Sequence, residues 1–188
     1  WYADHKVDGI LTQFHISHWT AYGVNYYLMA RAAFGEEEHE SVNNMLQKLF
    51  GKDAAIAVRF YGKLKKLIRS AGHCHIPYPY SLLSRTTLES YETVRSFALE
   101  LAEKAPDDPF RKELVLWTEY LCRFKKLFDD YRRGEAGARE VEEFRKWIHS
   151  HADTRIFVHP KIDMLLDAWI AAIKAKKEWL HFNLDWED

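Results

Sequence analysis

The sequence predicts an all-α fold, a multi-helix bundle of about seven helices preceded by one short strand. Three observations support this prediction. Apolar residues recur every three or four positions through most of the chain, which is the spacing of one face of an α-helix. Glycine and proline separate these segments at short intervals, so successive helices are joined by short connections. Residues 6–14 are the exception, because their apolar positions alternate roughly as in a strand.

The composition is that of a globular domain with a sizeable core. The 188 residues are 47% hydrophobic, 15% aromatic and 29% charged, and no shift in composition divides them into two globular units. The net charge of -1 gives no electrostatic reason to expect nucleic acid or an anionic membrane as a partner. No uncharged run approaches a membrane span, and Cys74 and Cys122 define no disulfide framework. A chain that begins at Trp1 without a signal peptide leaves the localisation open.

The first two predicted elements are the short strand and an aromatic helix. The apolar residues of the strand are Val7, Ile10, Leu11 and Phe14. Ser17 is a suitable N-cap for the helix, and Gly35 ends it. The apolar face of this helix consists of Trp19, Tyr22, Tyr26, Met29 and Ala33.

Glycines end the next two predicted helices. A short helix is expected from Ser41 to Phe50, because Gly51 follows it. A longer helix is expected from about Asp53 to Ala71, before Gly72. Its predicted core face consists of Ala54, Val58, Tyr61, Leu64 and Ile68.

Residues 73–80, with the sequence HCHIPYPY, predict a loop, because the two prolines exclude a regular helix. The fourth helix is expected to begin at a capping box formed by Thr86 and Glu89. The apolar stripe of this helix consists of Leu88, Tyr91, Val94, Ala98, Leu101 and Ala105.

The fifth helix has the most regular pattern in the chain. Asp108 is its expected N-cap, and Pro109 occupies its first turn. Apolar residues spaced alternately four and three apart suit a long helix packed nearly antiparallel on its neighbour. These residues are Phe110, Leu114, Trp117, Leu121, Phe124, Phe128 and Tyr131. A sixth helix is expected around Phe144 and Trp147, and a seventh from about Pro160 to Trp179.

A helical bundle does not account for the single strand at residues 6–14. An isolated strand cannot pair its own backbone donors and acceptors, and it is not stable by itself. We therefore expect this strand to belong to a sheet that is completed by protein outside the 188 residues, or by a strand from a second copy.

Several stretches near the start of the chain form a recognisable succession. They are Gly9-Ile10-Leu11, His18-Trp19, residues 23–31 (GVNYYLMAR) and residues 50–55 (FGKDAA) followed by Tyr61. This succession resembles the end of a large carbohydrate-active family related to alpha-glucuronidases and beta-hexosaminidases, long described as a domain of unknown function. In that family a (β/α)8 barrel is followed by a helical C-terminal region, and the last strand leads through a "W…NYYLAAR" helix to an "FYGPAA" turn. Here Lys52-Asp53 stands where that turn has one proline-like position.

The resemblance implies that residues 7–14 are the eighth strand of a barrel. Residues 1–16 would then be the terminal strand and loop of a preceding barrel, and residues 17–188 an α-helical C-terminal domain. Barrels of this type carry their chemistry at the C-terminal ends of the strands, so the resemblance places His15, His18 and Trp19 at the rim of a sugar pocket. An indole presents a flat apolar face to a pyranose ring, and an imidazole can donate to or accept from hydroxyl groups.

The resemblance also implies that the catalytic carboxylates lie on earlier strands, which are not among the 188 residues. On this interpretation the chain is an accessory domain of a glycoside-hydrolase-like protein. It would buttress the preceding barrel, contribute rim residues to the sugar pocket and bind carbohydrate only as part of the parent protein. The alternative is a non-catalytic helical scaffold or protein-interaction module, in which His15, His18 and Trp19 cap and pack the first helix.

The candidate metal ligands do not predict a metal site. The loop His73-Cys74-His75 and the later histidines His149, His151 and His159 lack the spaced pairs of ligands that zinc requires. Two Glu-x-x-His spacings, Glu36 to His39 and Glu178 to His181, are typical of di-iron bundles but lie near helix ends rather than in mid-bundle. No nucleotide-binding or hydrolase-nucleophile motif is present. We therefore expect no metal and no other cofactor.

Overall fold

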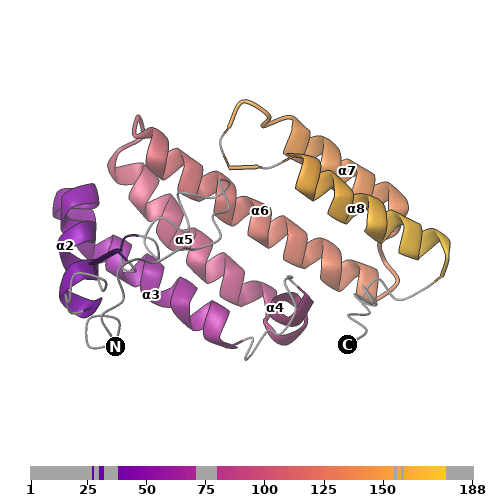
Figure 1. Ribbon diagram of the computed structural model, residues 1–188, viewed down its shortest axis with the longest axis horizontal. Coiled ribbons are helices and arrows are strands. Elements are labelled where there is room, and N and C mark those ends of the chain that lie inside the picture. Colours follow the sequence, from indigo (N-terminus) through magenta and orange to yellow (C-terminus); the bar gives the residue numbers. More distant parts are fainter. Residues whose placement is uncertain are drawn as a thin grey trace, which may run out of the picture.

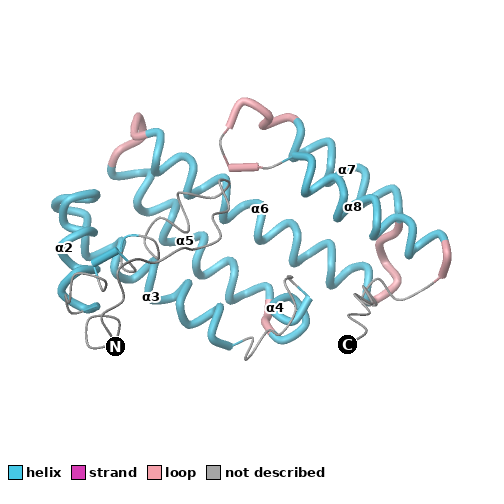
Figure 2. Tube along the Cα trace, viewed as in Figure 1, coloured by secondary structure: helices cyan, strands magenta, loops and turns pink. Residues whose placement is uncertain are grey.

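The computed structural model describes residues 27, 30–31, 38–70, 80–154, 156–157 and 159–176. These residues form helices joined by short loops, and no strand occurs among them (Figure 2). The prediction of an all-α fold is therefore confirmed for the part of the chain that is described. The predicted strand at residues 6–14 lies outside it. Of the predicted first helix, Tyr27, Ala30 and Arg31 are described and are helical.

The described helices follow the predicted order with two short additions, η1 and α4. They are α2 (Glu38–Phe50), the short 3-10 helix η1 (Gly51–Asp53), α3 (Ala54–Ser70), α4 (Tyr80–Arg85), α5 (Leu88–Lys104), α6 (Pro109–Arg132), α7 (Ala138–His149) and α8 (His159–Lys174). Helix α4 was not predicted, because it begins at the last residue of the proline-containing loop. None of the helices among the described residues is long and apolar enough to span a membrane.

Apart from the short α4, helices that follow one another in the sequence also lie next to one another in space. Helix α3 packs against α2 and α5, α6 packs against α5 and α7, and α8 packs against α7. Figure 1 shows the resulting array, with α2 and α3 at one end and α7 and α8 at the other. The most extensive contact joins α5 and α6 at the centre.

The cap of α6 confirms the prediction for the fifth helix. The carboxylate of Asp108 accepts a hydrogen bond from the backbone N–H of Phe110 at 2.9 Å, and Pro109 is the first helical residue. The predicted apolar stripe faces the core, since Leu114, Trp117 and Phe128 are buried. Packing against α5 therefore follows the spacing in the sequence.

The predicted capping box of α5 is wrong. The N-cap is Thr87, and its side chain makes no capping hydrogen bond. The Thr86 hydroxyl instead donates to the Tyr91 hydroxyl at 3.1 Å inside the protein. A buried phenol is costly without a partner, and Thr86 supplies one.

The predicted core face of α3 is only partly correct. Ala54 and Leu64 are buried, but Val58 and Ile68 are exposed. Helix α3 carries a second apolar stripe, and this stripe provides the other buried residues, which are Ile56, Ala57, Phe60 and Leu67. Both stripes fit the helical period, and the one with Phe60 faces inward because α2 and α5 pack on that side.

Candidate functional site

The residues that the resemblance assigns to a sugar pocket lie outside the described part of the chain. His15, His18 and Trp19 are among them, and so is the loop His73-Cys74-His75. The Glu-x-x-His pairs at 36–39 and 178–181 also include undescribed positions. The role of these residues stays a prediction, and the candidate sites considered below come from α2 to α8.

The later histidines gather where α7 and α8 meet. His149 Nε2 lies 2.9 Å from Asp163 Oδ1, and the His149 and His159 rings are 4.7 Å apart. His151 lies against its own helix, with Nδ1 2.8 Å from the backbone oxygen of Trp147. No group of three or more His, Cys, Asp or Glu in the described ranges could hold a metal ion. The pair of His149 with Asp163 therefore forms a polar contact between α7 and α8.

Arg111 is one of two buried cations in the described ranges, and its side chain is 6% exposed. Its guanidinium donates to Asp53 Oδ2 at 2.8 Å, to Asp108 Oδ2 at 3.1 Å and to the Leu101 carbonyl at 2.8 Å. It also lies over the Phe50 ring, 5.5 Å from the ring centre. One side chain thus joins η1, the end of α5 and the start of α6.

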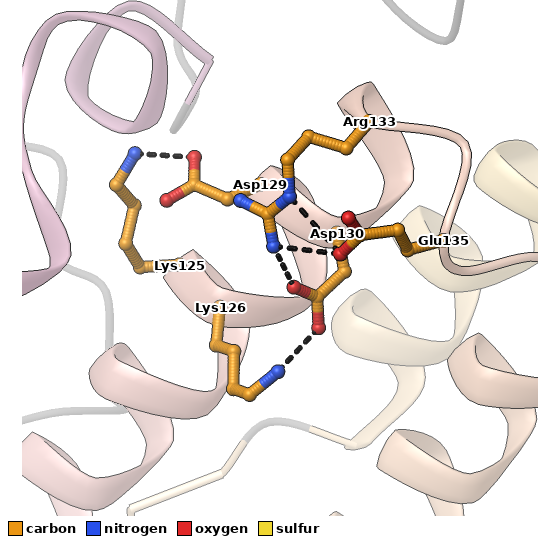
Figure 3. A network of polar contacts seen from close by, with 6 residues as sticks. All are labelled: Lys125, Lys126, Asp129, Asp130, Arg133 and Glu135. Carbon is orange, nitrogen blue, oxygen red and sulfur yellow. Dashed lines mark hydrogen bonds and ion pairs between the residues drawn. The ribbon is translucent and has the colours of Figure 1, made fainter.

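The second buried cation, Lys125, holds α4 on α6. Its Nζ donates to the Leu83 carbonyl at 2.7 Å and to Asp129 Oδ1 at 2.6 Å. Figure 3 shows Lys125 with Asp129 beside a more exposed network, in which Asp130 binds both Lys126 and Arg133. Carboxylates at the C-terminal end of a helix oppose its dipole, and these cations offset that effect.

Burial also suppresses the reactivity of two ionisable groups near Lys125. It raises the pKa of the Tyr91 phenol to about 12 and the pKa of the Cys122 thiol to about 11. A thiol with so high a pKa carries almost no thiolate at neutral pH. Cys122 is therefore unsuited to act as a nucleophile.

Aromatic rings join α6 to the α7–α8 pair. Phe124 and Phe144 stack with ring centres 5.7 Å apart, and Phe124 also contacts Trp169 at 6.0 Å. Trp147 is covered by Arg123, whose guanidinium carbon lies 4.7 Å from the ring centre. Because these faces are already occupied, they do not offer a flat platform for a sugar.

A shallow apolar hollow of about 400 Å³ lies between α5 and α6. Its lining residues are Leu99, Ala102, Glu103, Pro106, Lys112 and Val115. Glu103 and Lys112 are the ionisable residues among those that line it. The lining holds a single carboxylate, whereas glycoside hydrolysis uses a pair of carboxyl groups.

Sequence reasoning missed Arg111 and Lys125. The available signal was a charged residue on the buried side of a strongly periodic helix: Lys125 follows Phe124, and Arg111 follows Phe110. A carboxylate three or four residues away, Asp108 or Asp129, completes the pattern. The distant partners, Asp53 and the Leu83 carbonyl, could not be identified before the helices were placed.

Comparison of the chain with protein-family models, with curated proteins and with solved structures finds no match.

Proposed function

We propose that the chain is a helical accessory domain of a carbohydrate-active, glycoside-hydrolase-like protein. It buttresses a preceding (β/α)8 barrel, and His15, His18 and Trp19 contribute to the rim of a sugar pocket. The resemblance of residues 7–70 supports the carbohydrate part of this proposal. The catalytic carboxylates belong to the barrel, and the helices have a mechanical role.

One observation carries the mechanical role. Both buried cations, Arg111 and Lys125, donate hydrogen bonds to other elements as well as to carboxylates of α6 or its cap. The acceptors on other elements are Asp53, the Leu101 carbonyl and the Leu83 carbonyl. Residues that bind substrate keep polar groups directed into a cleft. Here those groups are directed between helices, which is the arrangement expected of a rigid support.

The alternative is a helical scaffold or protein-interaction module without any carbohydrate role. Large rings such as Trp169, Phe60 and Phe128 are buried in the core. This burial fits a rigid scaffold, whether or not the domain also has a carbohydrate role. Sugar binding separates the two functions, because only the accessory domain of a glycosidase places an aromatic rim beside a pocket.

The test is calorimetric titration of the longer polypeptide, in which the barrel precedes residue 1, with D-glucuronic acid and N-acetylglucosamine. Replacement Trp19→Ala removes a stacking contact worth about 0.5–1.5 kcal/mol, so affinity should fall about two- to tenfold. His15→Ala should also weaken binding, whereas His149→Ala, an exposed histidine on α7, serves as the control. Unchanged affinity in both rim variants, with intact folding, would favour the scaffold.

A further inference from the structure

His159, the first residue of α8, lies in an unusual environment where the end of α7 meets the start of α8. The residue is half-buried, but both of its ring nitrogens are shielded from solvent, and neither has a hydrogen-bond partner among the described residues. Its ring lies 4.7 Å from the ring of His149 and 6.2 Å from the ring of Phe157. Buried polar groups nearly always have a partner, so a histidine without one calls for an explanation.

The carboxylates at this contact between α7 and α8 are bound to other cations. His149 Nε2 lies 2.9 and 3.1 Å from the two carboxylate oxygens of Asp163. Arg145 binds Asp167, and its Nε lies 3.9 Å from Asp163 Oδ1. A positively charged His159 would therefore find no described carboxylate as its partner.

The other ionisable groups around this contact do not supply a partner either. On α6, Tyr120 lies against the loop between α7 and α8, with its ring 5.4 Å from that of Phe157. Further ionisable residues are described in the last two turns of α7, in the loop and in the first turn of α8, namely Glu142, Glu143, Lys146, His151, Asp153 and Lys161. None of them forms a hydrogen bond with the His159 ring.

A proton on His159 is opposed by three features of the folded chain. A proton on His149 is stabilised by Asp163, so a proton on His159 would place a second cation beside the first. The buried N–H groups of a charged His159 ring would have no acceptor among the described residues, which is costly. The N-terminal end of a helix also disfavours a cation, because the helix dipole is positive there.

We propose that His149 and His159 form a pH-sensitive contact, in which acidification detaches the first turn of α8 from the end of α7. Histidine commonly changes its charge between pH 8 and pH 5. Once detached, His159 is exposed to water and can hold a proton away from His149. Because the detached state binds more protons, the contact is stable at neutral pH and is lost as the pH falls. This response belongs to the helices themselves and does not depend on a carbohydrate role.

Hydrogen exchange of the 188-residue chain measures this contact directly. Protection of the backbone amides in the first turn of α8 should fall several-fold between pH 7.5 and pH 5.5, after correction for the intrinsic exchange rate, because this turn opens locally. Protection in α5, which lies away from the two histidines, should not change over the same range.

The decisive variant is His159→Phe. It keeps an aromatic ring against His149 and Phe157 but cannot gain a proton, so protection of the first turn of α8 should be equal at the two pH values. The matched control is His151→Phe, which removes a histidine from the neighbouring loop. His151 Nδ1 lies 2.8 Å from the Trp147 carbonyl oxygen, and its loss should leave the acid response of α8 in place.

Two results would overturn the proposal. Unchanged protection of α8 at pH 5.5 in the native chain would mean that the contact does not respond to acid. An equal loss of protection in the native chain and in His159→Phe would assign the response to another group. If His159→Phe does not fold, nuclear magnetic resonance titration of the native chain decides: the His159 ring and the first amides of α8 should shift over the same pH range. A ring that gains its proton while those amides stay unchanged would contradict the proposal.

Discussion

The two halves of the helical array are joined by different physical means. The half that contains α3, α5 and the start of α6 is crossed by a buried ion pair, in which Arg111 bonds Asp53 and Asp108. The half that contains α7 and α8 is joined to α6 by stacked rings, with charge pairs such as Arg145–Asp167 only at its surface. Hydrogen bonds of a buried ion specify one geometry, whereas ring burial supplies stability with less directional constraint.

The largest expected loss of stability comes from the half that contains the buried ion pair of Arg111. Arg111→Met leaves Asp53 buried without its cation, which should cost about 3–5 kcal/mol in the free energy of unfolding. Urea denaturation monitored by circular dichroism measures this. Arg59→Met, which breaks the exposed Arg59–Glu100 pair, is the matched control and should cost under about 1 kcal/mol. If both variants lose a similar free energy of unfolding, the buried ion pair contributes no more than the surface pair, which contradicts this account.

The next effect tests the aromatic half. Phe144→Ala removes the ring that stacks on Phe124 and Tyr120, and should cost about 3 kcal/mol, near the low end for a buried aromatic ring. Phe144→Leu, which keeps much of the volume, should recover more than half of the loss. If Leu is as damaging as Ala, ring stacking rather than burial holds this half together.

A smaller and more local effect is expected at α4. Lys125→Met leaves the Leu83 carbonyl without its donor, and an unsatisfied buried acceptor costs about 1–3 kcal/mol. Hydrogen exchange should show faster opening at α4 than at α5 or α7. Uniform acceleration across all three helices would contradict a role for Lys125 as a local clamp.

The smallest effect at neutral pH concerns Tyr91. Tyr91→Phe removes the hydrogen bond from Thr86 and should cost about 0.5–1.5 kcal/mol at pH 8. The pKa of Tyr91 is raised from 10.0 to about 12 by burial, so its contribution is present below pH 10 and is lost as pH rises to about 12. The urea midpoint, measured at pH 8, 10 and 11.5, should therefore fall less steeply with rising pH in Tyr91→Phe, which lacks this phenol, than in the native sequence. Parallel curves would contradict the burial of this phenol.

How much could be predicted from the sequence differed between elements. Helix α6 was predicted with its cap because Asp108 and Pro109 act locally and the apolar spacing is regular. Helix α4 was missed because its six residues are too few to show a period, and prolines at positions 77 and 79 indicate a loop. In α3 the choice between two apolar stripes depended on the positions of α2 and α5, which local pattern does not contain.

The candidate sites show the same limit. Arg111 and Lys125 could be noticed as charges beside apolar positions, but their partners lie 58 and 42 residues away in sequence. Such pairs form only when the helices pack, so sequence reasoning gives neither the partner nor the burial. The predicted rim residues His15, His18 and Trp19 depend on a resemblance and stay predictions.

The central claim is that the buried charges of this array serve to join helices. Polar groups that are kept for function often reduce stability, so replacing them often stabilises a protein. Replacing a polar group that joins helices should instead destabilise it. A double-mutant cycle with Arg111→Met and Asp53→Leu measures this directly through urea denaturation. We predict that both single variants are destabilised and that the pair is coupled by at least about 2 kcal/mol. Coupling near zero, or a single variant more stable than the native chain, would contradict the claim.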